Sequence, residues 1–368
     1  YIGSSGSSAT AGINVGTRRA NTTFTIEKNK VLRSINNNEQ SWATQGINLG
    51  GGNNHIVQNN FVSDVKNSQV AGTSAFSTTF GVFGIRVGSG TGYKIYHNSV
   101  HLYGLLPGVV NTDLTAAFAV VGTGQTGVDV RNNIFVNTLT GGNPTGTRNV
   151  AVYVPTGGTS AMNLTLNNND YFVGSDAQNR LAQRGSTFGT GEFTLADFDP
   201  MDTANPLNFR SYSSTLSAAG TNDNAGKKVD PLFVSNTDLH IDGMSPMLGM
   251  GAGVSVVDDI DGEMRPMVPD IGADEIAAVA VPGTLEFSSA TYSGPENSMA
   301  TITVSRTGGS DGAVTVDYAS TDDTATGGAS CGGLVDYVSA SGTLSFADGE
   351  TSKAFDVSLC APISTEGD

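Results

Sequence analysis

The sequence predicts an all-β protein in which a parallel β-solenoid is followed by a second β-domain. Three observations predict this order. One short motif recurs five times between residues 24 and 172, and Gly is abundant, with 48 residues. Of 30 Asn residues, 29 lie before residue 237, so the composition changes along the chain. Beyond that change, apolar and polar residues alternate at 301–305 and 314–318, which is typical of half-buried strands.

The recurring motif has an apolar residue on either side of a variable one, two more residues, and then an Asn. An apolar pair follows the Asn in most copies. The motif Asn residues are Asn29, Asn60, Asn98, Asn133 and Asn169, separated by 31, 38, 35 and 36 residues. A constant motif with variable spacing predicts coils of constant cross-section joined by loops of variable length.

A second strand precedes the motif in each of the later coils. Ile47 and Ile85 each lie 13 residues before the motif Asn of their coil, and 117–121 and 150–154 are the matching strands further along. No single coil buries its own apolar face, so the coils must stack. We expect the Asn residues to form a structural column at equivalent bends, because Asn tolerates left-handed backbone and its amide can bond to the Asn of the next coil.

The motif is similar to that of the right-handed parallel β-helix proteins of the pectate-lyase-like superfamily. The resemblance lies in Asn-Asn-Phe-Val at 59–62, Asn-Asn-Ile-Phe at 132–135 and Asn-Asn-Asp-Tyr-Phe at 168–172. The stretch from Asp230-Pro-Leu-Phe to Asp-Ile-Gly-Ala-Asp-Glu275 resembles the terminal segment of secreted bacterial β-helix proteins. These resemblances imply a β-helix domain over residues 1–276.

A small-residue linker at 277–282 separates the two domains. The remainder, 283–368, resembles the Calx-beta family in Ala-Thr-Ile-Thr-Val-Ser-Arg at 300–306, Asp-Tyr at 336–337 and Asp-Gly-Glu at 348–350. The resemblance implies an immunoglobulin-like antiparallel β-sandwich. In the family, the final strand follows a Glu-rich turn, and here that strand would lie beyond Asp368. We therefore expect this sandwich to be incomplete and the chain to be part of a longer protein.

The Calx-beta resemblance implies a possible calcium site at one tip of the sandwich. The family's carboxylates map to Glu296, Asp336 and Glu366, whereas its acidic pair before the last strand is replaced by Ala-Pro-Ile at 361–363. Calcium takes six to eight oxygen ligands, so three carboxylates with carbonyls and water would form a weak site. The alternative is a domain that keeps the shape without a strong site.

Cys331 and Cys360 are the two cysteines of the chain, and both lie in the second domain. One intramolecular pairing is possible, and we expect this disulfide in an extracellular setting; two buried thiols are the alternative.

The remaining polar residues give no catalytic pattern. Asp258, Asp259, Asp261 and Glu263 form the densest acidic cluster, which suits either a turn or a bound cation. None of the four His residues has the spacing of a triad or a metal site, and His97 beside Asn98 is interpreted as a bend residue. Lyases and hydrolases of related folds need carboxylates and a base in a column. No such column recurs here, so the sequence leans against an enzyme.

Composition restricts the partners. The formal net charge of −16, without a basic cluster, argues against nucleic acid. No apolar run is long enough for a membrane span. We therefore expect a secreted or cell-surface structural or adhesive protein that contributes to an extracellular assembly or filament. Its expected partners are copies of itself or cell-surface components, and the alternative is a β-helix that binds or cleaves a polysaccharide.

Overall fold

The computed structural model describes residues 9–16, 23–36, 43–67, 76–106, 113–199, 208–276 and 280–361. The chain forms two compact units, Tyr1–Ala277 and Ala278–Asp368. Nearly all regular structure is β, which confirms the predicted fold class. Within the described ranges, no helix has the length and apolar content needed to cross a bilayer.

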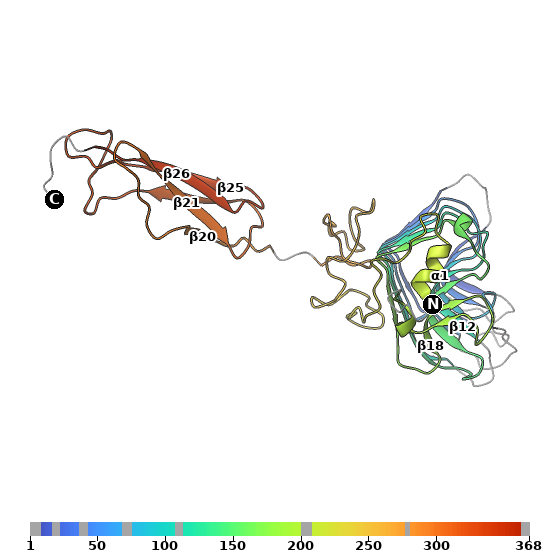
Figure 1. The fold of residues 1–368 in the computed structure, drawn as a ribbon. Coiled ribbons are helices and arrows are strands. Elements are labelled where there is room, and N and C mark those ends of the chain that lie inside the picture. Colours follow the sequence, from blue (N-terminus) through green and yellow to red (C-terminus); the bar gives the residue numbers. More distant parts are fainter. Residues whose placement is uncertain are drawn as a thin grey trace. The chain divides into compact units, whose positions relative to one another are not determined.

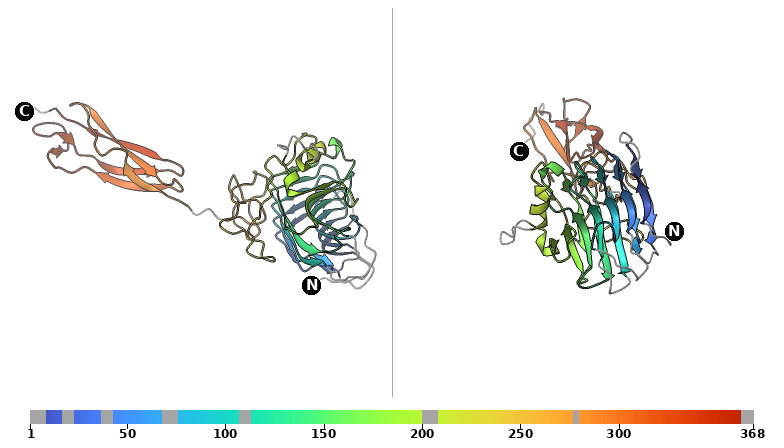
Figure 2. Two further views of the ribbon diagram at one scale, coloured as in Figure 1. Left: turned by 60° about the horizontal axis from the view of Figure 1, so that its bottom comes forward. Right: turned by 90° about the vertical axis from the view of Figure 1, so that its right-hand side faces the viewer.

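Three sheets run along the first unit and form a β-solenoid (Figures 1 and 2). Sheet 1 contains β1 (Thr10–Val15), β5 (Thr44–Leu49), β9 (Val82–Val87), β12 (Leu114–Val120), β15 (Arg148–Val154), β18 (Asn179–Arg184) and β19 (Glu192–Phe193). Sheet 2 contains β2 (Thr25–Glu27), β6 (Ile56–Gln58), β10 (Lys94–Tyr96), β13 (Asp129–Arg131) and β16 (Thr165–Asn167). Sheet 3 contains β3 (Lys30–Leu32), β7 (Phe61–Ser63), β11 (Ser99–Leu106), β14 (Ile134–Gly141) and β17 (Asp170–Val173).

Equivalent residues of successive coils pair in register, so the motif becomes a set of columns. Val57 pairs with Ile95, and Ile95 pairs with Val130, in sheet 2. All three side chains are completely buried. Complete burial of such a side chain contributes about 1.5 to 3 kcal/mol, which explains why the central apolar position recurs in every coil.

The motif Asn residues form a ladder of side-chain amides. Asn29 Nδ2 donates to Asn60 Oδ1 at 2.9 Å, and Asn60 Nδ2 donates to Asn98 Oδ1 at 2.8 Å. The same bond joins Asn98 to Asn133 and Asn133 to Asn169, both at 2.9 Å. The ladder therefore places all five Asn residues of the motif in one column.

The left-handed bend lies one residue before the ladder, which corrects one of the two reasons that we gave for Asn at these positions; the other, the amide bonds between coils, is confirmed. The positive φ angles, between 50° and 60°, belong to Lys28, Asn59, His97, Asn132 and Asn168. These five residues are called the bend column. The ladder residues themselves have no positive φ. A ladder Asn is selected by its hydrogen bonds, whereas the preceding bend residue is selected by its tolerance of left-handed backbone, so Lys and His are found there too.

The parallel coils end at β18, although the first unit continues to Ala277. β19 pairs with β18 in the antiparallel direction. The short helix α1 (Phe209–Thr215) then covers the end of the apolar core, where Phe209 is fully buried. The end of the solenoid is thereby covered by its own chain, so the β-helix predicted for 1–276 consists of coils to residue 184 followed by a cap and a long irregular segment.

That irregular segment, residues 230–276, is called the covering segment. It runs along the coils on the outer side of sheet 3 (Figure 1), where Ile241, Met247 and Ile271 pack against Ile134 and Val136. It also bonds to the bend column: Asn59 Nδ2 donates to Asp258 O, Asn132 Nδ2 to Ala252 O and Asn168 Nδ2 to Met250 O, at 2.7 to 2.9 Å. The bend residues therefore hold the covering segment in place.

The second unit is an antiparallel β-sandwich. One sheet contains β20 (Thr284–Phe287), β21 (Met299–Thr307) and β26 (Ser352–Ser358), and the other contains β22 (Val314–Ala319) and β25 (Ser341–Phe346). β23 (Gly327–Gly328) and β24 (Tyr337–Val338) form a small separate pair. Val304, Leu344 and Phe346 form the buried centre between the sheets.

Candidate functional site

The clearest cluster of ionisable side chains lies in the covering segment around His240. Its imidazole stands between two carboxylates: Nδ1 bonds to Asp238 Oδ1, and Nε2 bonds to Asp261 Oδ2. The ring also meets Phe61 of β7 edge-on, with ring centres 4.8 Å apart. A third carboxylate, that of Asp274, lies close enough for His240, Asp261 and Asp274 to face one point. The histidine thus links the covering segment to the outer face of sheet 3.

The charge state of His240 follows from these neighbours. Burial lowers its pKa, but the bonds to Asp261 and Asp238 outweigh burial, so the pKa lies above its ordinary value. The bond to His240 in turn lowers the pKa of Asp261. Both ring nitrogens face carboxylate oxygens, so the imidazolium ion is the form that satisfies both bonds. The three groups therefore form a charged hydrogen-bonded unit.

The predicted acidic cluster at 258–263 is largely used to shape the chain. Asp259 Oδ1 accepts bonds from the backbone N–H groups of Asp261, Gly262 and Glu263, at 2.7 to 2.9 Å. Asp258 pairs with Lys28 of the bend column at 2.8 Å. Asp259, Asp261 and Glu263 still have oxygens close enough to face a common point. We gave two interpretations of this cluster, a turn and a bound cation. The backbone bonds to Asp259 are those of a turn.

A buried ion pair fixes the end of the covering segment. Arg265 Nη1 donates to Glu275 Oε2 at 2.9 Å, and Arg265 Nη2 donates to Asn59 Oδ1 at 3.1 Å. The Arg265 and Glu275 side chains are almost completely inaccessible to solvent. Burial raises the pKa of Glu275 to about 7 in spite of the neighbouring guanidinium. Removing either partner would leave a buried charge unpaired, so this pair is a positioning contact.

Two of the three predicted calcium ligands, Glu296 and Asp336, lie at one end of the sandwich. The backbone of Leu359 bonds to Ser298 O on one side and pairs with Tyr337 on the other, so the loops of Glu296 and Asp336 flank the same stretch of chain. The Asp336 carboxylate accepts a bond from Thr326 N at 2.7 Å, and Glu296 is exposed. Glu366 lies outside the described residues. Neither Glu296 nor Asp336 belongs to a close group of three ligands among the described residues.

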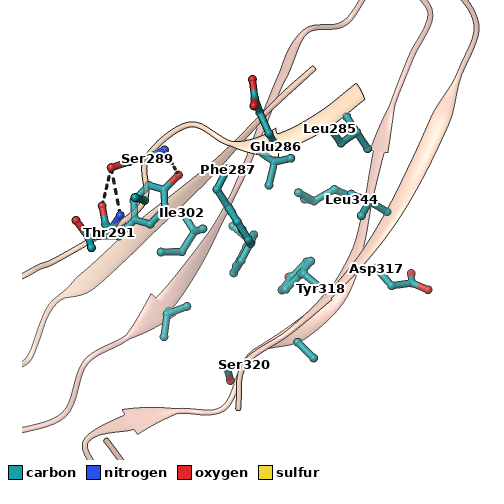
Figure 3. A pocket seen from close by; sticks show the side chains of 17 residues that line it. Leu285, Glu286, Phe287, Ser289, Thr291, Ile302, Asp317, Tyr318, Ser320 and Leu344 are labelled. Atoms are coloured by element: carbon teal, nitrogen blue, oxygen red, sulfur yellow. Dashed lines mark hydrogen bonds between the residues drawn. The ribbon is translucent and has the colours of Figure 1, made fainter. Parts of the chain in front are cut away.

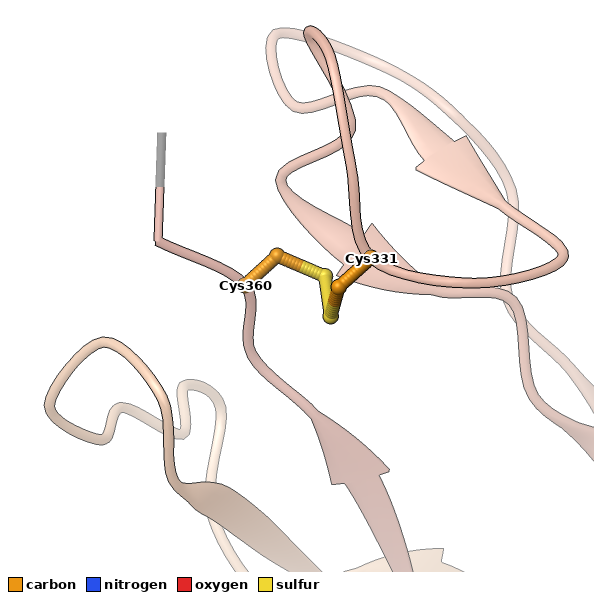
Figure 4. The surroundings of a disulfide bond; sticks show 2 residues. All are labelled: Cys331 and Cys360. Carbon is orange, nitrogen blue, oxygen red and sulfur yellow. A yellow bond between two sulfur atoms is a disulfide. The ribbon is translucent and has the colours of Figure 1, made fainter. Parts of the chain in front are cut away.

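Cys331 and Cys360 form a disulfide (Figure 4). Their Cα atoms are 5.4 Å apart, and the backbone N–H of Cys360 donates to Asp336 O at 2.8 Å. The bond therefore attaches the loop before β24 to the chain that leaves β26.

The antiparallel strand pairs of the second unit coincide with the part of the chain that matches a known family. Residues 280–368 match the Calx-beta domain family. No curated protein and no solved structure matched the chain. The Calx-beta assignment therefore identifies the second unit, and the β-solenoid is characterised by its own geometry.

The Calx-beta domain also contains an apolar groove between its two sheets (Figure 3). Ile302 of β21, Tyr318 of β22 and Phe355 of β26 line it, and the rings of Tyr318 and Phe355 stack with centres 3.8 Å apart. Both rings are half-buried, and Phe287 of β20 is 60% exposed. The groove lies between the two sheets, and its lining also includes Glu286, Tyr292 and Asp317.

Two features were not found from the sequence. On the outer face of sheet 2, register places Glu27, Gln58, Tyr96, Arg131 and Asn167 in one row. Within it, Tyr96 Oη donates to Asp129 Oδ2 at 2.6 Å, and the Arg131 guanidinium lies 5.3 Å from the Tyr96 ring centre. The second feature is a cavity beside His101. Each member of the row lies two residues before a ladder Asn, so the alignment of the five motif copies is the signal that could have revealed it.

Proposed function

We propose that this chain is a structural and adhesive protein of the cell surface that contributes to an extracellular assembly. The observation that carries the proposal is that the polar side chains of the first unit bond to each other and to the covering segment. From Lys28 to Asn168, the bend column bonds to the covering segment, and the ladder Asn residues bond to each other. Such bonds rigidify a rod because each coil is fixed both to its neighbours and to a segment that crosses them all.

The charged groups of the candidate site support the same proposal. Asp258, Asp259 and Arg265 all make bonds within the unit, so the region with the highest density of charge stabilises the fold. The disulfide of the Calx-beta domain supports an extracellular location, because disulfides persist in oxidising compartments.

Copies of this chain and other cell-surface components are the proposed partners. Calcium is the proposed cofactor, bound weakly at the tip that carries Glu296 and Asp336, or bridging exposed carboxylates of neighbouring copies. A net charge of −16 opposes close approach of two copies, and divalent cations would reduce that repulsion.

A second candidate function, polysaccharide binding, is favoured by the row on sheet 2. The covering segment lies on sheet 3, and Gln58 and Arg131 of the row are half-exposed. Lys94 lies two residues before Tyr96 on β10, next to the row on the same face of sheet 2, and it is exposed. A polymer lying along the solenoid would meet one side chain for each coil, about every 4.8 Å. The Asp129 carboxylate already accepts bonds from Tyr96 and Arg131, which favours binding over cleavage.

The test is to follow purified protein by light scattering and electron microscopy, with calcium added and then chelated. A reducing-end assay and a co-sedimentation assay on a panel of polysaccharides run in parallel. Calcium-dependent, reversible assembly without turnover is the expected result. Turnover of any polymer by a protein that stays monomeric would replace the proposal with the enzyme alternative. Co-sedimentation that a Lys94→Ala variant weakens, and a Lys353→Ala control in the Calx-beta domain does not, would favour the second candidate.

A further inference from the structure

A cavity of about 310 Å³ lies where the start of the covering segment crosses sheet 3. Its floor includes His101 of β11, Thr138 of β14 and Phe172 of β17. Its wall includes Asp230 and Phe233 of the covering segment. The cavity thus gathers aromatic rings, an imidazole and a carboxylate from four separate parts of the chain, and it is distinct from the His240 cluster.

The side chain of His101 lines this cavity, and one of its ring nitrogens has no hydrogen-bond partner among the described residues. The residue is 7% exposed, and its Nε2 lies 2.8 Å from Thr138 Oγ1. In the tautomer that pairs both groups, the Thr138 hydroxyl donates to Leu102 O at 3.5 Å and its oxygen accepts from Nε2–H. Nδ1 therefore carries a lone pair, and it is buried without a hydrogen-bond partner among the described residues. Buried acceptors are rarely left unpaired, so this nitrogen indicates a missing donor.

The charge of the cavity is negative. Asp230 acts on His101 and raises its pKa, but burial has the larger effect and lowers that pKa to about 4. The imidazole is therefore neutral at pH 7, while no Lys or Arg is among the described residues that line the cavity. Asp230 is held by a bond from Leu232 N at 3.0 Å, and Leu232 itself has a strained φ of 56°. Asp230 itself is exposed, and the bond from Leu232 N orients its carboxylate, whose charge acts on the imidazole.

We propose that this cavity binds a primary ammonium group. Such a group has three N–H donors and one positive charge. It donates to His101 Nδ1 and to the Asp230 carboxylate, and the Asn236 amide at the rim offers a further acceptor. The rings of Phe172 and Phe233 present π-electrons to the cation. A neutral alcohol of the same length lacks the charge, and a quaternary ammonium lacks the donors, so both are expected to bind less tightly.

The test is isothermal titration of the full chain with n-butylammonium chloride at constant ionic strength, with n-butanol and tetramethylammonium chloride as comparison probes. We expect a dissociation constant on the order of 1 mM for n-butylammonium and about tenfold weaker binding of the other two. D-glucosamine and Nα-acetyl-lysine are two further arms, which separate an amino sugar from an amino-acid side chain as the source of the group.

Asp230→Asn removes the charge and keeps an oxygen for Leu232 N, so we expect it to weaken n-butylammonium binding about tenfold. Asp242→Asn is the matched control, because Asp242 makes the same kind of bond to Met244 N outside the cavity. If Asp230→Asn does not fold, Asn236→Lys serves instead, since its own ammonium would occupy the cavity and abolish binding. Equal affinity for n-butanol, unchanged binding by folded Asp230→Asn or Asn236→Lys, or no binding of any amine would overturn the proposal.

Discussion

The Asn ladder provides a quantitative test of how the solenoid is stabilised, through the substitution Asn98→Ala at its centre. Asn98 is completely buried. Its Nδ2 donates to Val57 O, Tyr96 O and Asn133 Oδ1, and its Oδ1 accepts from the backbone and the side chain of Asn60. Alanine removes all these bonds and leaves Asn60 N without its acceptor.

The expected loss is about 4 kcal/mol. The unpaired Asn60 N–H costs about 2 kcal/mol, and the two N–H groups of the lost amide, which share three acceptors, account for about 1 kcal/mol each. Asn29→Ala is the matched control. Asn29 is half-buried at the outer position of the ladder, where its amide donates to Glu27 O and Asn60 Oδ1. Its loss should cost about 1 kcal/mol, because water can replace these partners.

Hydrogen exchange with mass spectrometry measures this difference. A loss of about 4 kcal/mol corresponds to roughly a thousandfold faster exchange in β10 and β13, where exchange follows opening of the coils. Peptides from β21 in the Calx-beta domain are the internal reference and should not change. If Asn98→Ala accelerates exchange no more than Asn29→Ala does, the ladder is not the source of stability that its geometry indicates.

Three further predictions follow from the structure. Thiol labelling of denatured, unreduced protein should find no free thiol, and two labelled cysteines would refute the disulfide. Replacing Cys331 and Cys360 by Ser should destabilise the Calx-beta domain by about 3 to 4 kcal/mol in chemical denaturation, because the two residues are 29 positions apart. Burial raises the pKa of Asp170 from 3.8 to about 8, so the folded state binds more protons than the unfolded chain between these values, and stability should fall as pH rises through that window. Asp170→Asn should flatten this slope in thermal unfolding measured from about pH 5 to about pH 8, leaving a smaller slope from Asp223 and Glu275, whose pKa values are both raised to about 7. An unchanged slope would exclude Asp170 as its source. Calcium should increase the particle size seen by light scattering and a chelator should reverse it; a size that does not respond would argue against cation-promoted association.

The sequence by itself determined the features that repeat locally. Each coil carries its own apolar alternation and its own Asn, so the solenoid and the Asn column could be predicted without knowing any long-range contact. The Calx-beta domain was predictable for a related reason, since its motifs lie within one continuous stretch. With two cysteines in the chain, the pairing of Cys331 with Cys360 had no intramolecular alternative.

Only the tertiary structure decided where the covering segment lies and what it brings together. Lys28 meets Asp258 across 230 residues, and Asn132 meets Ala252 across 120. No local pattern encodes such pairs, because the segment is irregular and its path depends on the surface that the finished coils present. The cavity beside His101 arises in the same way, from three adjacent strands and one crossing loop. Local periodicity therefore specified the rod, whereas packing of an aperiodic segment on that rod created its most distinctive sites.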